Sequence, residues 1–138
     1  MEPEKLIELA LEARERAYVP YSNWAVGAAL LTQDGRVYKG CNIENAAYTP
    51  TNCAERTAVF KAVSEGDSKF EAIAVVGGTK GEAPSSFCSP CGVCRQVLME
   101  FCNPETFLVY VAISPDEYRT YTLQELLPAG FGPKDLGK

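Results

Sequence analysis

Three cysteines at three-residue intervals constrain this chain more than any other feature of its sequence. The stretch FCSPCGVCRQ places thiols at Cys88, Cys91 and Cys94. Thiols gathered in this way are typical of a metal site, and zinc prefers four ligands in a tetrahedron. Ser89-Pro90 predicts a helix start, with serine as N-cap and proline at the first helical position. Cys91 and Cys94 would then lie one turn apart on one face of that helix.

A fourth cysteine, Cys53, opens a second predicted helix with the sequence CAERTAVFKAVSEG. Two helix N-termini directed at one point would lower the thiol pKa values and stabilise thiolates. If Cys53 joins Cys91 and Cys94, three thiolates leave the fourth zinc position for water, as in catalytic sites. If Cys88 joins as well, the site is closed and structural. The spacing alone leaves both possibilities open.

Glu55, two residues beyond Cys53, is the candidate proton carrier that favours the open site. The alternative role for this glutamate is a capping box over Asn52-Cys53-Ala54-Glu55. Two positions on a regular helix span about 200° of rotation, so Cys53 and Glu55 reach one site only if it lies off the helix tip. The chain has no histidine, so acid–base chemistry must use carboxylates, thiols, tyrosines or lysines.

Length and charge exclude several classes of protein. The 138 residues have the length of one domain, residues 1–138. The net charge of −5 argues against a protein that grips long nucleic acid, so a small ligand fits better. No segment approaches the roughly 20 apolar residues of a membrane span, and the N-terminus lacks the apolar run of a signal peptide. We therefore expect a cytoplasmic protein whose six cysteines are reduced or bind metal.

Apolar periodicity predicts an α/β fold with one sheet covered by helices on both faces. Asp34-Gly35 is a strong turn signal between two apolar runs and predicts a hairpin. Cys41 and Cys102 are expected to be small buried apolar groups, and Tyr110 to belong to the core. The expected order is helix 4–17, hairpin 24–44, helix 53–66, strand 72–78, helix 90–102, strand 107–113, a short strand near 119–123 and a capped turn at 122–125.

Four short motifs connect the cysteines with the rest of the chain: N-I-E-N-A at 42–46, C-A-E-R-T-A at 53–58, S-P-C-G-V-C-R-Q at 89–96 and E-L-L-P at 125–128. Zinc nucleoside and nucleobase deaminases carry H-x-E…P-C-x-x-C, in which Cys can replace His and the Glu does not bind zinc. Together the motifs resemble the small, homotetrameric cytidine deaminases, from about residue 5 to residue 133. The resemblance implies a three-layer α-β-α sandwich around a single mixed sheet, with one zinc ion per subunit.

The resemblance also implies an activity, the hydrolytic deamination of cytidine and 2′-deoxycytidine to uridine and 2′-deoxyuridine with release of ammonia, in pyrimidine salvage. Cys53, Cys91 and Cys94 would bind the zinc, which leaves Cys88 spare. A zinc-bound hydroxide would attack C4 of cytosine while Glu55 shuttles protons. Two alternatives are a related deaminase for a cytosine-containing antibiotic of the blasticidin S type and a structural zinc module.

The substrate contacts implied by the resemblance come from several subunits. Asn42 and Glu44 match the pair that hydrogen-bonds the ribose hydroxyls. Position 24 is usually Phe and stacks on the base; here it is Trp24, and the loop before Cys88 is a few residues longer than usual. These two departures from the family pattern affect how the base and the ribose would fit in the substrate pocket. The other matching positions are the backbone around Ala54 and Ser89, Ala46 and Tyr48 from a second subunit, and Phe131 from a third.

Two polar residues are expected to support the thiolates from outside. Three thiolates bring one negative charge more than Zn²⁺ balances, and Arg56 with the two helix N-termini can offset that excess. An exposed helix charge of little energetic weight is the alternative for Arg56. Gln96 is expected to hydrogen-bond to the same cluster. Trp24 and Phe131 could each be core residues, as aromatics usually are, although Phe131 lies in a Gly/Pro-rich tail.

Overall fold

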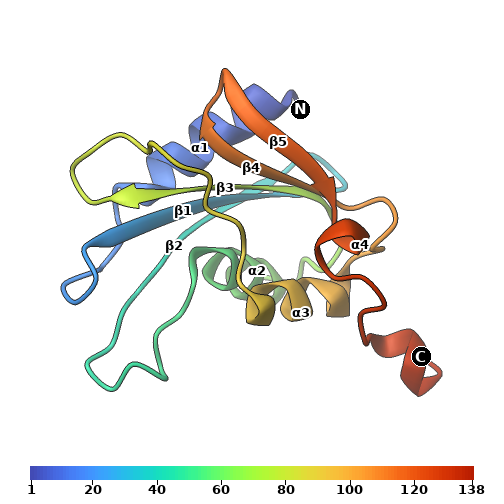
Figure 1. Ribbon diagram of the computed structural model, residues 1–138. Helices are drawn as coiled ribbons and strands as arrows, with labels where there is room; N and C mark the ends of the chain where they lie inside the picture. The colour runs from blue at the N-terminus through green and yellow to red at the C-terminus, as the bar shows by residue number, and fades with distance from the viewer.

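The structure, a computed structural model, describes residues 1–138 and is built on one five-stranded sheet (Figure 1). The order of the strands across the sheet is β2-β1-β3-β4-β5. β3 and β4 run parallel, whereas the other neighbouring pairs are antiparallel, so the sheet is mixed. The strands are β1 (Trp24–Thr32), β2 (Val37–Cys41), β3 (Phe70–Thr79), β4 (Leu108–Ser114) and β5 (Glu117–Thr122).

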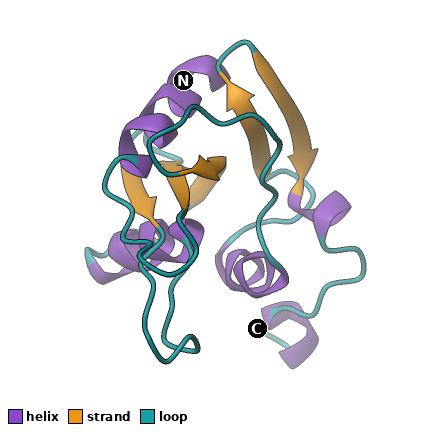
Figure 2. Ribbon diagram, turned by 60° about the vertical axis from the view of Figure 1, so that its left-hand side comes forward, coloured by secondary structure: helices purple, strands orange, loops and turns teal.

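Helices cover both faces of this sheet, which confirms the predicted three-layer α-β-α sandwich (Figures 1 and 2). α1 lies on one face, and α2 and α3 lie side by side on the other. The helices are α1 (Pro3–Arg14), α2 (Ala54–Ser64), α3 (Gly92–Phe101) and α4 (Leu123–Leu126), followed by a short 3₁₀ helix (Pro133–Leu136). None of these helices has the length and apolar character that crossing a membrane requires.

Strand β1 shares its side chains between two apolar cores, because successive residues of a strand point to opposite faces. Ala28 and Leu30 pack in the core beneath α2 and α3. Ala29 and Leu31 pack in the core beneath α1. The same alternation in β3 explains why residues 72–78 read as one continuous apolar run.

The hairpin between β1 and β2 forms as predicted. Asp34-Gly35 makes the turn, and Gly35 has a φ of +91°, in the left-handed region that favours glycine. The capped turn at Thr122 is also confirmed, since Thr122 and Glu125 form a capping box. Tyr110 is a core residue, and Cys102 is buried, whereas Cys41 is only half-buried.

One predicted helix start and one predicted helix end are wrong. α1 ends at Arg14 rather than at residue 17. α3 begins at Gly92 with Cys91 as its N-cap, so Ser89 and Pro90 precede the helix. At α2 the N-cap is Cys53, and no side chain caps the helix, so the alternative role of Glu55 in a capping box is not supported.

Candidate metal centre

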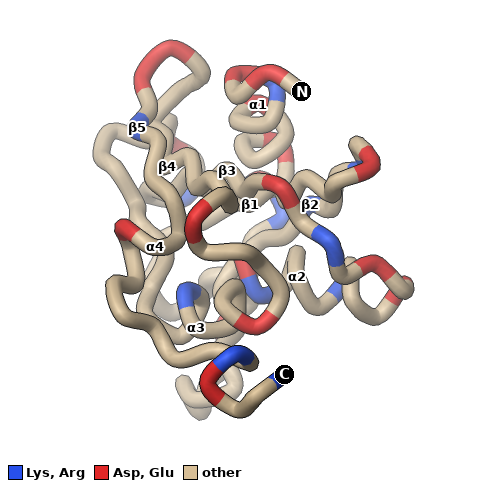
Figure 3. The backbone as a smooth tube through the Cα atoms, turned by 90° about the vertical axis from the view of Figure 1, so that its right-hand side faces the viewer, with Lys and Arg blue, Asp and Glu red and all other residues tan.

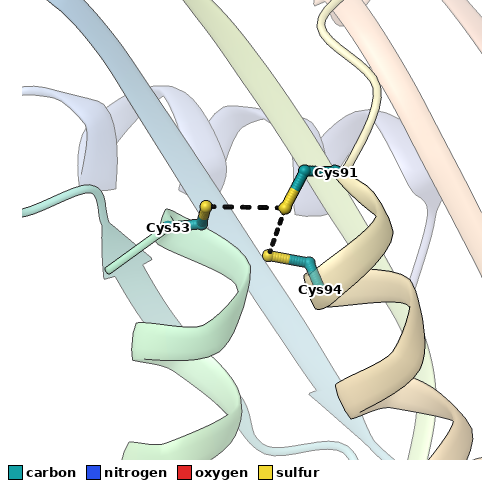
Figure 4. Close-up of side chains that lie close together, drawn as sticks. All are labelled: Cys53, Cys91 and Cys94. Carbon is teal, nitrogen blue, oxygen red and sulfur yellow. Dashed lines mark hydrogen bonds between the residues drawn. The ribbon is translucent and has the colours of Figure 1, made fainter. Parts of the chain in front are cut away.

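The N-termini of α2 and α3 bring three thiols together (Figure 4). Cys53 is the N-cap of α2, Cys91 is the N-cap of α3, and Cys94 lies in the first turn of α3. The sulfur of Cys91 is 3.7 Å from that of Cys53 and 3.6 Å from that of Cys94. All three sulfurs lie within 4.8 Å of one another. Segments 38 residues apart therefore form one compact cluster.

The spacing of the sulfurs fits a tetrahedral zinc ion. Zinc–thiolate bonds of about 2.3 Å place two sulfurs of a tetrahedron about 3.8 Å apart. Three soft sulfur ligands also favour zinc over magnesium or calcium. The sulfur of Cys88 is not part of the cluster. The closed site with four thiolates is therefore not supported, and a metal held here keeps one corner without a protein sulfur.

The thiols of the cluster share protons with one another. The pKa of Cys53 is lowered to about 5, chiefly because the Cys94 thiol donates to its sulfur, with a further donor in Arg56. The pKa of Cys94 is raised, because its proton is held in that hydrogen bond and because it is buried. The lowered pKa of Cys53 favours the thiolate form that metal binding requires.

Arg56 contacts the cluster directly. Its Nη2 donates to the Cys53 sulfur at 3.2 Å. Burial opposes the charge of the guanidinium, yet its pKa is raised, because the side chain donates to Cys53 and Cys94. The Nε of Arg56 is buried without a partner. This arginine is therefore not an exposed helix charge.

Glu55 lies buried beside the thiols, with only 4% of its surface exposed. Cys53 precedes the helix with extended backbone, and Glu55 is the second residue of α2. The two side chains leave from the helix tip, so the rotation between them on a regular helix does not separate them. Burial raises the pKa of Glu55 to about 7; its own backbone N–H partly opposes this, and the nearby Cys53 thiolate adds to it. A carboxyl group with this pKa can both accept and release a proton near neutral pH.

The two predicted ribose-binding residues are held by hydrogen bonds within the chain. Asn42 accepts from the Val26 N–H at 2.9 Å and donates to the Trp24 carbonyl at 2.9 Å. Glu44 accepts from the backbone N–H of Tyr21 and Ser22 and from the Ser22 hydroxyl. The Ser22 hydroxyl is also the main reason that the pKa of Glu44 is lowered.

The other predicted contact residues differ in exposure. Ala54 is fully buried in the first turn of α2, whereas Ser89 is exposed just before Pro90. Trp24 and Phe131 are exposed, by 38% and 58%, so neither is a core residue. Ala46 and Tyr48 are exposed in the loop between β2 and α2, and the Tyr48 ring meets that of Tyr21 edge to face at 6.4 Å.

The expected hydrogen bond from Gln96 to the cluster is absent. Its side-chain amide donates to the carbonyl of Phe131 at 2.7 Å. Gln96 lies two positions beyond Cys94, about 200° around the helix, and so faces away from the sulfurs. This side chain instead holds the C-terminal tail against α3.

Sequence reasoning missed the residues that support the loop before β1. Ser22 links Glu44 to Trp24, because its hydroxyl also accepts from the Trp24 N–H at 3.0 Å. Arg14 is buried and donates to the carbonyls of Ala25 and Thr79. A serine two residues before a strand was a visible signal of a local hydrogen bond. An arginine near the end of an amphipathic helix gave no such signal.

Comparison with known proteins gives one consistent result. The family described as "Cytidine and deoxycytidylate deaminase zinc-binding region" matches residues 1–110. Cytidine deaminases from Sporosarcina psychrophila and Halalkalibacterium halodurans are 54% and 52% identical over 136 residues, which covers 99% of this chain and 96% and 98% of those proteins. The crystal structure of cytidine deaminase from Burkholderia pseudomallei has a TM-score of 0.86 at 48% identity, covering 95% of this chain and 100% of that one.

Proposed function

The chain belongs to the cytidine and deoxycytidylate deaminase family, and from this membership we propose how its residues perform the hydrolytic deamination of cytidine. In this reaction cytidine and water give uridine and ammonia, so the chain is a zinc-dependent hydrolase acting on a C–N bond. We extend the substrate range to 2′-deoxycytidine. The observation that carries the proposal is a cluster of three thiols with an open corner, beside one buried carboxyl group.

Cys53, Cys91 and Cys94 are the proposed zinc ligands. A zinc ion held by these three thiolates would lower the pKa of a bound water to about 7 and so would supply a nucleophile at neutral pH. Arg56 offsets the excess negative charge of three thiolates by donating to Cys53. The Nε of Arg56 is buried and has no hydrogen-bond partner.

Glu55 is the proposed proton shuttle. Its carboxyl group takes a proton from the attacking water and delivers it to N3 of the base, which makes C4 more electrophilic. A second proton passes through the same group to the 4-amino nitrogen, which leaves as ammonia. Glu55 suits this task because its side chain is shielded from bulk water and is held at the tip of α2 beside Cys53.

Asn42 and Glu44 are proposed to bind the ribose hydroxyls. A carboxylate offers about four acceptor positions, and Glu44 uses three of them within the chain, so it keeps room for a ribose hydroxyl. Asn42 likewise uses only part of its capacity. The backbone around Ala54 and Ser89 is proposed to contact the base, and Trp24 to stack on it.

We propose that the whole chain, residues 1–138, acts as one domain within a homotetramer that completes its active sites between neighbours. Large apolar side chains stand exposed on the outer surfaces of α2 and α3, at Phe60 and Val93. Tyr48 and Phe131 are exposed on loops. A neighbouring subunit that covered these side chains would remove their apolar surface from water, which supports the assignment of Ala46, Tyr48 and Phe131 to a neighbour's site.

Pyrimidine salvage in the cytoplasm is the proposed setting. All six cysteines are free, which fits a reducing compartment. Figure 3 shows Lys and Arg dispersed over several elements among Asp and Glu. A free nucleoside, which carries no phosphate, suits a protein with this charge distribution better than a polynucleotide.

A direct assay with a matched pair of variants tests the proposal. The wild-type protein should contain one zinc per chain and convert cytidine to equal amounts of uridine and ammonia. Glu55→Gln should retain zinc and lose at least about 10²-fold in kcat. Glu65→Gln, an exposed change at the other end of the same helix, should behave as wild type. An active Glu55→Gln protein, or a zinc-loaded wild type that releases no ammonia, would overturn the proposal.

A further inference from the structure

We propose that Cys88, which lies outside the metal-binding cluster, is a positioning residue for substrate binding. Its sulfur packs over Gly77 and holds the indole of Trp24 in place beside the thiolate cluster. The inference rests on the proposed function in one respect, the stacking of Trp24 on the base. It adds a residue that the reaction itself does not require.

Gly77 is the point where the two side chains meet. A Cβ atom built on Gly77 would lie 2.7 Å from the sulfur of Cys88 and 3.2 Å from Nε1 of Trp24. Both groups therefore occupy the space that a side chain at position 77 would fill. Any larger residue there would expel at least one of them, so the glycine permits the contact.

Strand geometry places this contact on the face of the sheet that carries the metal centre. Trp24 lies two residues before Val26, which packs in the core beneath α2 and α3. Gly77 lies two residues after Val75, which belongs to the same core. Because side chains alternate along a strand, Trp24 and Gly77 face the layer of α2 and α3.

Both Trp24 and Glu55 belong to the surroundings of the Cys88 thiol. Burial raises the pKa of its thiol; the indole N–H of Trp24 partly opposes this by donating to the sulfur, and the charges of Glu55 and Cys53 add to the rise. The thiol thus stays neutral at physiological pH and can accept the indole N–H. A neutral sulfur in this position leaves the charge of the cluster unchanged.

The loop that carries Cys88 is anchored on both sides of the cysteine. Phe87 packs against the core beneath α2 and α3, and the guanidinium of Arg119 from β5 lies 4.1 Å from the centre of its ring. Pro90, two residues after Cys88, is buried just before the N-cap of α3. A fixed sulfur can position an indole, whereas a mobile one could not.

The backbone of Trp24 is held independently of Cys88. Its N–H donates to the Ser22 hydroxyl at 3.0 Å, and its carbonyl accepts from the Asn42 amide at 2.9 Å. What remains free is the rotation of the indole about its side-chain bonds. Removing the Cys88 sulfur should release this rotation without moving the strand.

The single tryptophan of the chain makes the contact measurable without any assay of activity. A thiol in contact with an indole quenches its emission, so Cys88→Ala should raise the fluorescence of Trp24. The same variant should raise KM for cytidine about 5-fold or more, because an unordered indole loses part of its stacking on the base. Its kcat should stay within about 2-fold of wild type, since Glu55 and the thiolates are unchanged. Cys41→Ala, at a half-buried thiol of β2, is the control and should change neither quantity.

A double-mutant cycle tests whether Cys88 acts through Trp24. Trp24→Phe removes the indole N–H, so Cys88→Ala should have little further effect on KM in that background. An equal KM increase in both backgrounds would show that Cys88 acts without Trp24 and would overturn the proposal. Unchanged emission or unchanged KM in the single Cys88→Ala variant would also overturn it.

Further variants distinguish the proposed role of Cys88 from an effect of misfolding. The fluorescence measurement also separates it from a failure of the proposed function. If Cys88→Ala loses zinc, Cys88→Val is used instead of Cys88→Ala in the double-mutant cycle, because it also removes the sulfur acceptor. Cys88→Ser keeps an acceptor but not the quenching thiol, so its emission should rise while KM stays near the wild-type value. A wild type that forms no uridine would refute the proposed function, whereas the emission of the variants would still decide whether Cys88 contacts Trp24.

Discussion

At the scale of single residues, the position of Cys53 explains how one short stretch can supply both the proposed metal ligand and the proposed proton carrier. Cys53 has extended backbone as the N-cap of α2, and Glu55 is the second residue inside the helix. A regular helix through both would turn them to opposite sides. The change from extended to helical backbone at Cys53 is what lets both side chains reach the same site.

Arg56 gives the residue-scale prediction. Its guanidinium donates to the Cys53 sulfur and, in the proposed zinc site, would balance part of the charge of three thiolates. Arg56→Gln should lower zinc affinity or kcat by about 10- to 100-fold, the usual effect of removing a residue that supports metal ligands. Titration with a zinc chelator and steady-state kinetics measure the two quantities. Arg16→Gln, an exposed arginine of the segment after α1, is the control, and equal effects of the two changes would contradict the role given to Arg56.

At the scale of elements, two glycines decide how closely helices approach the sheet. A Cβ atom on Gly40 of β2 would lie 2.4 Å from the Ala54 carbonyl oxygen and 2.5 Å from the Ala58 nitrogen of α2. A Cβ atom on Gly27 of β1 would lie 2.1 Å from the Ala10 carbonyl oxygen of α1. Real Cβ atoms do not come so close to backbone, so each glycine allows one helix to pack against the sheet.

Gly40 and Gly27 face helices on opposite sides of the sheet. Substituting each of them therefore separates an effect on stability alone from an effect on metal binding. Gly40→Ala should push the N-terminus of α2 outward, with Cys53 and Glu55 on it, and so weaken zinc binding as well as lower the melting temperature. Gly27→Ala should lower the melting temperature by displacing α1 but leave zinc affinity nearly unchanged in the folded protein. Overpacking of this kind typically costs about 1–3 kcal/mol. Thermal unfolding and zinc titration measure both effects; stronger loss of zinc in Gly27→Ala would contradict the assignment.

Local signals in the sequence predicted most elements, and contacts distant along the chain account for the errors. The Asp34-Gly35 turn and the apolar runs of β1 and β3 depend on neighbouring residues, so their patterns could be interpreted directly. The start of α3 could not, because a Ser-Pro signal of about 1 kcal/mol yields to the packing that brings Cys91 to Cys53. The direction of the Cys88 sulfur depends on Gly77, a residue of another strand that the sequence pattern does not connect with it.

At the scale of the whole molecule, the C-terminal tail exposes an aromatic ring that its own chain does not cover. It extends from α4 beyond α3 (Figure 1), where Gln96 holds the Phe131 carbonyl and leaves the ring of Phe131 exposed. An aromatic ring presented in this way suits a neighbouring subunit. If the active sites are shared, Phe131 and Glu55 of one chain serve different sites.

Mixing two defective variants tests this division of labour. Glu55→Gln should be inactive and Phe131→Ala should bind cytidine weakly, each as a homo-oligomer. After co-expression, random assembly places a normal Glu55 beside a normal Phe131 in about a quarter of the sites, so the mixture should bind and turn over cytidine better than the sum of the separate proteins. Mixing the same proteins as intact oligomers, without exchange of subunits, is the control. If each Phe131 served its own chain, co-expression would give no gain, and the shared site would have to be abandoned even though the chemistry at the thiolates would stand.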